Sequence, residues 1–204
     1  MTAEGWGVLQ VRAGQPLHWS IHSLGGNAHI CQLEGIWQAG KVMLSDKEAA
    51  NCHIAFHITP QGINVSDNED ETCRYFCGVR AGYTGQYERP PAACTPSQVR
   101  KTRQNFQQAY QRQAYAQAAQ LLAPVLAQCE RYMTWLDKGW LRNDLGLTQA
   151  KLHDKACQVT LAPLAEDAMK SDEVLQSEYA PSDAEAWLRV VKAARTNLKK
   201  CAAI

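Results

Sequence analysis

The stretch "CTPSQVRKTRQNFQQAY", residues 94–110, marks the point where the chain changes its pattern. Before Cys94, apolar and polar residues alternate, which is the period of a β-strand. After Cys94, apolar residues recur with a period of about 3.6, as in an α-helix. The "TPSQ" that follows Cys94 predicts a helix start, with a hydroxyl cap, a proline in the first turn and a glutamine placed to close a capping box. The sequence therefore predicts two domains, residues 1–94 and 95–204.

The first domain is predicted to be an antiparallel β meander, folded as a small sandwich or barrel-like sheet. Its alternating segments, separated by Gly, Asn, Pro or Asp, are "WGVLQV" (6–11), "LHWSIH" (17–22), "HICQLEGIW" (29–37), "KVMLS" (41–45), "CHIAFHI" (52–58) and "GINVS" (62–66). The clearest hairpin has Ile54, Phe56 and Ile58 on one face and a turn at residues 60–62.

The second domain is predicted to consist of helical hairpins. "QRQAY" (111–115) indicates a turn between two antiparallel helices, and Pro124 is expected to end or kink the second one. A turn at His153–Asp154 joins a further pair. "YAQAAQLLAPVLAQC" (115–129) and "KACQVTLAPLAEDA" (155–168) lie about 40 residues apart, near the period of tetratricopeptide repeats.

A last helix is expected from a capping box at residues 182–185 to about Lys200. Such a helix can cover the last apolar face of a helical stack. Two helix pairs are fewer than an independent solenoid usually needs, so the helical domain is expected to pack against the sheet. The predicted fold class is α+β, with tetratricopeptide-like hairpins and disulfide bracing.

Eight cysteines favour an oxidising compartment, because cytosolic proteins keep few thiols unless these bind metal or react. The cysteines are Cys31, Cys52, Cys73, Cys77 and Cys94 in the first domain, and Cys129, Cys157 and Cys201 in the second. Both counts are odd, so at least one disulfide must join the domains if all are paired. Eight cysteines allow about 105 pairings. Cys129–Cys157 is the preferred bridge within the second domain, which leaves Cys201 for the bridge between domains.

The segment "CRYFCGVRA" (73–81) raises the question of a reactive or metal-binding pair. A redox pair usually has Cys-x-x-Cys spacing, and a zinc site needs a second pair of similar spacing. Cys73 and Cys77 are therefore expected to be structural, each bonded elsewhere. A Cys77 nucleophile with His53 or His57 as its base would require a reduced protein, which the cysteine content disfavours.

Histidines supply the alternative of a zinc enzyme. Five of them lie in the first domain: His18, His22, His29, His53 and His57. The even spacing within 18/22 and 53/57 keeps each pair on one strand face. Their spacing matches no ligand motif, and Gly-x-Ser-x-Gly, His-Glu-x-x-His and Walker sequences do not occur. We therefore expect no catalytic residue, no metal and no cofactor, and the acidic residues at 67–71 are expected to be a solvated hairpin.

Charge and hydropathy restrict the partners. With 21 basic and 20 acidic residues, the chain has no electrostatic signature for nucleic acid or an anionic membrane. Apolar runs are much shorter than the roughly 20 residues that span a bilayer, so membrane insertion is not expected. Residues 1–5 lack the features of a secretory signal peptide. The cysteines nevertheless favour export, and we expect a periplasmic location.

Most of residues 50–201 resembles a family of exported proteobacterial proteins. The resemblance rests on "CHIAFHITPQGINV", "CRYFCGVRAGYTGQY", "GWLRNDLGLTQAKLHDKACQVTLAPLA" and "DAEAWLRVVKAARTNLKKC". It implies a secreted or periplasmic protein with a cysteine-rich β region, loosely similar to periplasmic lysozyme inhibitors, followed by a tetratricopeptide-like region. The resemblance implies no activity and no catalytic residues.

The function expected from these features is binding to another protein without catalysis, as an inhibitor or a toxin-immunity protein that occludes its target. The target would be a toxin, a hydrolase or an envelope component; the alternatives are a zinc-dependent or other envelope enzyme and a structural adaptor. Arginine and aromatic residues are typical interface anchors, although the aromatic ones also fit a core. The candidates are Arg74, Tyr75, Phe76, Arg80, Tyr83, Tyr87, Trp135, Trp140 and Arg142.

Overall fold

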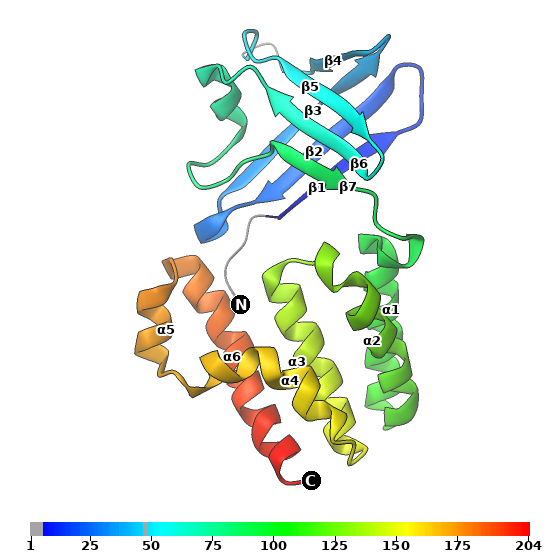
Figure 1. The fold of residues 1–204 in the computed structure, drawn as a ribbon, viewed down its shortest axis with the longest axis vertical. Helices are drawn as coiled ribbons and strands as arrows, with labels where there is room; N and C mark the ends of the chain where they lie inside the picture. The colour runs from blue at the N-terminus through cyan, green and yellow to red at the C-terminus, as the bar shows by residue number, and fades with distance from the viewer. Residues whose placement is uncertain (1–5, 47–48) are drawn as a thin grey trace. The chain divides into compact units, whose positions relative to one another are not determined.

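The structure is a computed structural model that describes residues 6–46 and 49–204. The chain divides into two compact units, of which the first ends at Arg89 and the second begins at Pro90. Antiparallel sheets form the first unit and α-helices form the second (Figure 1). The predicted α+β class is therefore confirmed.

The first unit contains a four-stranded sheet of order β1-β2-β3-β4 and a three-stranded sheet of order β5-β6-β7. Every neighbouring pair of strands is antiparallel and joins strands that are consecutive in the chain. The strands are β1 (Trp6–Arg12), β2 (Leu17–Leu24), β3 (Ile30–Gln38), β4 (Lys41–Leu44), β5 (Ile54–Thr59), β6 (Gly62–Asp67) and β7 (Gly85–Glu88). Figure 1 shows the three-stranded sheet lying across the four-stranded one.

The two sheets of the first unit share one apolar core. Alternation along β2 buries Trp19 and Ile21, and Ile21 pairs with buried Leu33 on β3. From the other sheet, the ring of Phe56 contacts Trp19 edge-on, with ring centroids 5.2 Å apart, and Trp37 at 5.3 Å. These contacts between rings hold the inner faces of the sheets together.

The β5–β6 hairpin is as predicted, since β5 ends at Thr59 and β6 begins at Gly62. The Gly62 amide donates to the Thr59 hydroxyl at 3.1 Å across the turn. Ile54 is buried, but Ile58 is 75% exposed. The apolar face of β5 therefore leaves the core at the turn end of the strand.

The helices of the second unit are α1 (Pro96–Gln111), α2 (Tyr115–Cys129), α3 (Trp135–Lys151), α4 (Ala156–Met169), α5 (Asp172–Glu178) and α6 (Pro181–Ala202). The predicted turns at 111–115 and 153–154 are confirmed. Pro124 does not end α2, which continues through it to Cys129.

Thr95 is the N-cap of α1 and Pro96 is its first residue, as predicted, but the side-chain capping bond is absent, and the predicted start of the last helix is wrong. The Thr95 side chain makes no capping hydrogen bond, because its hydroxyl donates instead to the Ala92 carbonyl at 3.1 Å. The last helix begins at Pro181, one residue before the expected box, and its N-cap is Ala180, whose side chain has no group to accept a hydrogen bond. Proline in the first turn starts both helices without a side-chain cap.

Helix α3 is central in the helical unit because small and polar residues let its neighbours approach closely. A Cβ on Gly139 would lie 2.6 Å from Val190 of α6, and one on Gly146 would lie 2.6 Å from Leu161 of α4. Between these glycines, buried Asn143 donates to the Val190 carbonyl at 3.0 Å and accepts from Asn197 at 2.9 Å. This hydrogen-bonded pair fixes the register of α3 against α6.

All eight cysteines form disulfides, as expected, but the predicted pairings are wrong. The bridges are Cys31–Cys77, Cys52–Cys73, Cys94–Cys129 and Cys157–Cys201. Cys129 bonds to Cys94 because Cys94 lies directly before α1, whose partner helix α2 ends at Cys129. Cys201 bonds to Cys157 because α6 packs against α4. Cys94 belongs to the helical unit, so each unit contains two complete bridges and the bridge predicted between domains is wrong.

Candidate functional site

The segment 68–84, which joins β6 to β7, holds five of the predicted partner-binding residues, and we call it the braced loop. Two disulfides attach it to the sheets. Cys73 is bonded to Cys52, which precedes β5, and Cys77 is bonded to Cys31 on β3, with Cα atoms 4.9 and 4.1 Å apart. Its two cysteines are structural, as predicted, and neither is a free thiol that could act as a nucleophile.

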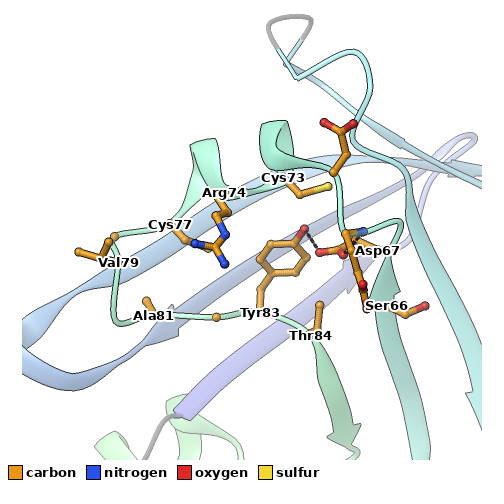
Figure 2. A pocket seen from close by; sticks show the side chains of 13 residues that line it. Ser66, Asp67, Cys73, Arg74, Cys77, Val79, Ala81, Tyr83 and Thr84 are labelled. Carbon is orange, nitrogen blue, oxygen red and sulfur yellow. Dashed lines mark hydrogen bonds between the residues drawn. The ribbon is translucent and has the colours of Figure 1, made fainter.

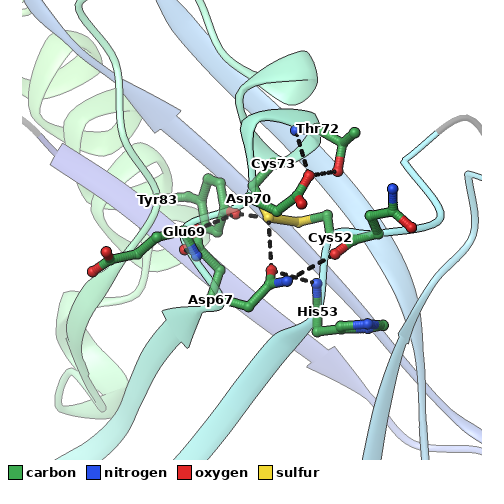
Figure 3. Close-up of a disulfide and its surroundings, with 10 residues drawn as sticks. Cys52, His53, Asp67, Glu69, Asp70, Thr72, Cys73 and Tyr83 are labelled. Carbon is green, nitrogen blue, oxygen red and sulfur yellow. Dashed lines mark hydrogen bonds between the residues drawn. A yellow bond between two sulfur atoms is a disulfide. The ribbon is translucent and has the colours of Figure 1, made fainter.

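Hydrogen bonds accepted by the side chains of Asn68 and Asp70 shape the first part of the braced loop, and Figure 3 shows those between Asp70 and Thr72. The Asn68 amide oxygen accepts from the His53 backbone at 3.0 Å. Asp70 caps a short 3-10 helix, η2 (Glu71–Phe76), by accepting from the Thr72 amide at 2.9 Å and the Thr72 hydroxyl at 2.6 Å. These hydrogen bonds hold the pKa of Asp70 below its usual range. The acidic run is thus partly a helix cap rather than only a solvated hairpin.

The tip of the braced loop is a tight turn over residues 78–81. The Ala81 amide donates to the Gly78 carbonyl at 2.9 Å, which places Val79 and Arg80 at the two central positions of the turn. The Gly78 amide also donates to the Ile30 carbonyl at 2.9 Å. Val79 is 89% exposed and Arg80 is exposed as well. The turn therefore presents an aliphatic and a cationic side chain to solvent.

The return of the braced loop is fixed at three points. The Ser23 hydroxyl of β2 donates to the Gly82 carbonyl at 2.7 Å. Gly25 lies so close to the loop that a Cβ there would be 1.9 Å from the Arg80 carbonyl oxygen. Tyr83 is only 4% exposed, and the Tyr87 hydroxyl donates to its carbonyl at 2.7 Å.

The Tyr83 side chain links the two ends of the braced loop. Its hydroxyl donates to the Asp67 carboxylate at 2.5 Å. Burial and this hydrogen bond raise the pKa of Tyr83 far above its usual range, and burial raises the pKa of Tyr87 to about 12. Tyr83 is therefore a core residue that also lines the hollow beside the loop, and its role in partner binding stays a prediction.

An open hollow of about 680 Å³ lies beside the braced loop and is lined by its residues and by Ser66 and Asp67. Figure 2 shows the Arg74 side chain extending over this hollow toward Tyr83, with Asp67 beyond the tyrosine ring. Glu69 and Asp70 also line it. The hollow thus has carboxylates where the loop begins and the Arg74 guanidinium further along it.

The remaining candidates in the first unit differ in their exposure. Arg74 and Tyr75 are exposed, Tyr75 by 60%, and Phe76 is half-buried. The rings of Tyr75 and Phe76 meet edge-on with centroids 5.4 Å apart. Tyr87 on β7 is half-buried.

The candidates of the helical unit brace that unit internally. Trp135 stacks on Tyr179, with centroids 5.8 Å apart, and packs against buried Trp187. Trp140 packs against the same core. Arg142 pairs with Glu130 and donates to the Thr160 carbonyl at 3.0 Å. These contacts inside the helical unit explain the positions of all three side chains, so no external partner is needed to explain them.

A metal site does not form among the described residues, where no group of three His, Cys, Asp or Glu side chains is placed to hold an ion. His18 and His22 are exposed on β2, and His53 and His57 are exposed around β5. The described helices are also too short or too polar to cross a membrane.

Sequence reasoning missed Val79, Ser23 and Gly25, which present or anchor the loop tip. Val79 does carry a sequence signal, because it is an aliphatic residue that stands between Gly78 and Arg80, shortly after Cys77. Ser23 and Gly25 carry no sequence signal, because their partners lie more than 50 residues further along the chain.

Comparison of the chain with known proteins gave no match among family models, curated proteins or solved structures. The braced loop and its hollow are therefore interpreted from their own geometry.

Proposed function

We propose that this is a non-enzymatic binding protein that blocks a target protein by placing the tip of the braced loop in the target's cleft, as an inhibitor or a toxin-immunity protein does. The observation that supports this proposal is the turn at Val79 and Arg80. Both side chains are exposed, while the backbone on either side is held by a disulfide, by hydrogen bonds and by close packing on Gly25.

A held loop is suited to docking for an energetic reason. Ordering a flexible segment on binding costs conformational free energy, at about 0.5–1.5 kcal/mol for each immobilised side chain and more for a backbone that must be fixed. In the braced loop the backbone is already fixed by folding. Exposed arginine and tyrosine side chains are the types that most often dominate binding energy, and Arg74, Tyr75 and Arg80 supply them.

The four disulfides are consistent with an oxidising compartment outside the cytoplasm. We extend this to a periplasmic location and to membership of the exported family that the sequence resembles. We also propose that the helical unit is tetratricopeptide-like, with α1–α2 and α3–α4 as its two pairs and α6 as a cap. The packing of α6 on both α3 and α4 supports this assignment.

The test is a pull-down from the periplasm and culture medium of the producing cells, using the oxidised protein as bait. Mass spectrometry would identify a retained protein, whose activity is then measured with and without the bait. We compare the wild type with Val79→Asp at the loop tip. Val159→Asp is the matched control, because Val159 is 78% exposed on α4 of the other unit.

The proposal expects one stoichiometric partner whose activity falls on binding, with binding lost in V79D and kept in V159D. Retention of the same partner by V79D would show that the loop tip is not the binding surface. A partner that binds without loss of activity would identify an adaptor instead.

A further inference from the structure

The exposed cations of the braced loop are Arg74 and Arg80. Neither Arg74 nor Arg80 forms an ion pair with a described residue. Elsewhere, arginines with a structural role are paired, as Arg142 is with Glu130 and Arg195 with Asp172. The two loop guanidinium groups therefore keep their full capacity to bind an external anion.

The positions of these two arginines are defined by the fold. Arg80 occupies the third position of the turn at 78–81, and its carbonyl packs on Gly25. Arg74 lies in η2 between the two bridged cysteines and extends over the hollow (Figure 2). A guanidinium group binds a carboxylate with two parallel hydrogen bonds in one plane, so arginines carried on a held backbone are suited to a carboxylate.

The charge around the loop is divided along its length. Glu69, Asp70 and Glu71 precede Cys73, and the two arginines follow it. A uniform polyanion would meet repulsion from the acidic end at the same time as attraction from the basic end. With a net charge of +1, the protein also has little long-range attraction for polyanions. A folded protein that offers carboxylates at one place only fits this pattern better.

We propose that the partner is a protein with recessed carboxylates in its cleft, which bind Arg80 and Arg74 while Val79 and Tyr75 fill apolar positions beside them. This inference rests on the proposed function and specifies the chemistry of the partner. The exposed apolar side chains exclude water around the ion pairs, which makes each pair stronger than it would be in solvent.

The test uses a displayed library of random disulfide-closed peptides, selected on the oxidised full-length protein. Selected peptides are counted for Asp and Glu and then synthesised, and their dissociation constants are measured for three forms of the protein. These are the wild type, Arg74→Gln/Arg80→Gln, and the matched control Arg12→Gln/Arg89→Gln. The control removes the same charge from two exposed arginines of the same unit.

The expected result is enrichment of Asp or Glu beside apolar residues, with affinity reduced about tenfold or more in R74Q/R80Q and unchanged in the control. Glu69→Gln, which removes an exposed acid from the same loop, should leave the affinity equal or higher. Circular dichroism and a zero thiol count would show that every variant is folded and oxidised.

Other results would overturn the inference in distinguishable ways. Selected peptides without acids that still require Val79 would refute the carboxylate partner and leave the proposed function standing. An empty selection, or peptides indifferent to R74Q/R80Q, would also refute it, and the separate V79D pull-down then decides the proposed function. Heparin binding that is lost in R74Q/R80Q would identify a polyanion in place of a protein.

Discussion

The Cys31–Cys77 bridge gives a quantitative prediction for the stability of the first unit. The bridge closes a loop of 46 residues, but Cys52–Cys73 lies inside it and bypasses 21 of them. The effective closed loop is therefore about 25 residues, and chain entropy gives about 3.5 kcal/mol of stabilisation for a loop of that length. Cys31→Ala/Cys77→Ala should lower the free energy of unfolding of this unit by about that amount.

The matched comparison is Cys157→Ala/Cys201→Ala in the helical unit. This bridge closes 44 residues with no other bridge inside, so its removal should cost about 4 kcal/mol. The second variant should thus lose slightly more stability although its loop is shorter in sequence.

Hydrogen exchange read by mass spectrometry separates the two units, because each peptide reports its own unit. In the first variant, the slowest amides of β2 and β3 should exchange roughly 300-fold faster, while those of α4 and α6 remain unchanged. The Gly78 and Ala81 amides at the loop tip should lose protection most. A loss below about 1 kcal/mol in β2 and β3, or protection retained at the tip, would refute the reasoning that this bridge holds the loop.

Three further predictions concern single side chains. Asn143→Ala leaves buried polar partners without a hydrogen bond and should lower the free energy of unfolding by about 2–3 kcal/mol in urea titrations of the helical unit. Gly25→Ala should speed trypsin cleavage after Arg80 because the added Cβ would collide with the Arg80 carbonyl, whereas Gly82→Ala, with open space around its Cβ, should not. Tyr83 keeps its proton in the folded state above pH 10 while the unfolded state loses it, so stability should fall by about 1.4 kcal/mol for each pH unit above 10. This slope should be smaller in Tyr83→Phe when alkaline unfolding is followed by circular dichroism.

Local periodicity was sufficient to predict most of the fold. The change of period near Cys94 separates strands from helices, and the turns at 60–62 and 111–115 lie where glycine, proline and polar residues interrupt the pattern. These features depend on neighbours in sequence, so a sequence is enough to recognise them.

The pairing of Cys94 could not be predicted in the same way. The helical unit begins at Pro90 with a single 3-10 turn, η3 (Ala92–Cys94), which has no periodicity to mark it. Placing the boundary after Cys94 made both cysteine counts odd and led to the incorrect pairings.

The site was predicted only in part, because its geometry depends on contacts distant in sequence. Arg74, Tyr75 and Arg80 have residue types that suggest an interface and are exposed. Tyr83 has the same type but is buried, since its hydroxyl binds Asp67 across the base of the loop. A residue's type thus indicates what it can bind, and only the fold determines whether it is accessible.

The confinement of two disulfides to each unit also simplifies oxidative folding. Four cysteines can pair in about three ways, against about 105 for eight. Cys31, Cys52, Cys73 and Cys77 can therefore find their partners within the first unit, without any cysteine of the helical unit. Each unit can correct its own bridges without disturbing those of the other.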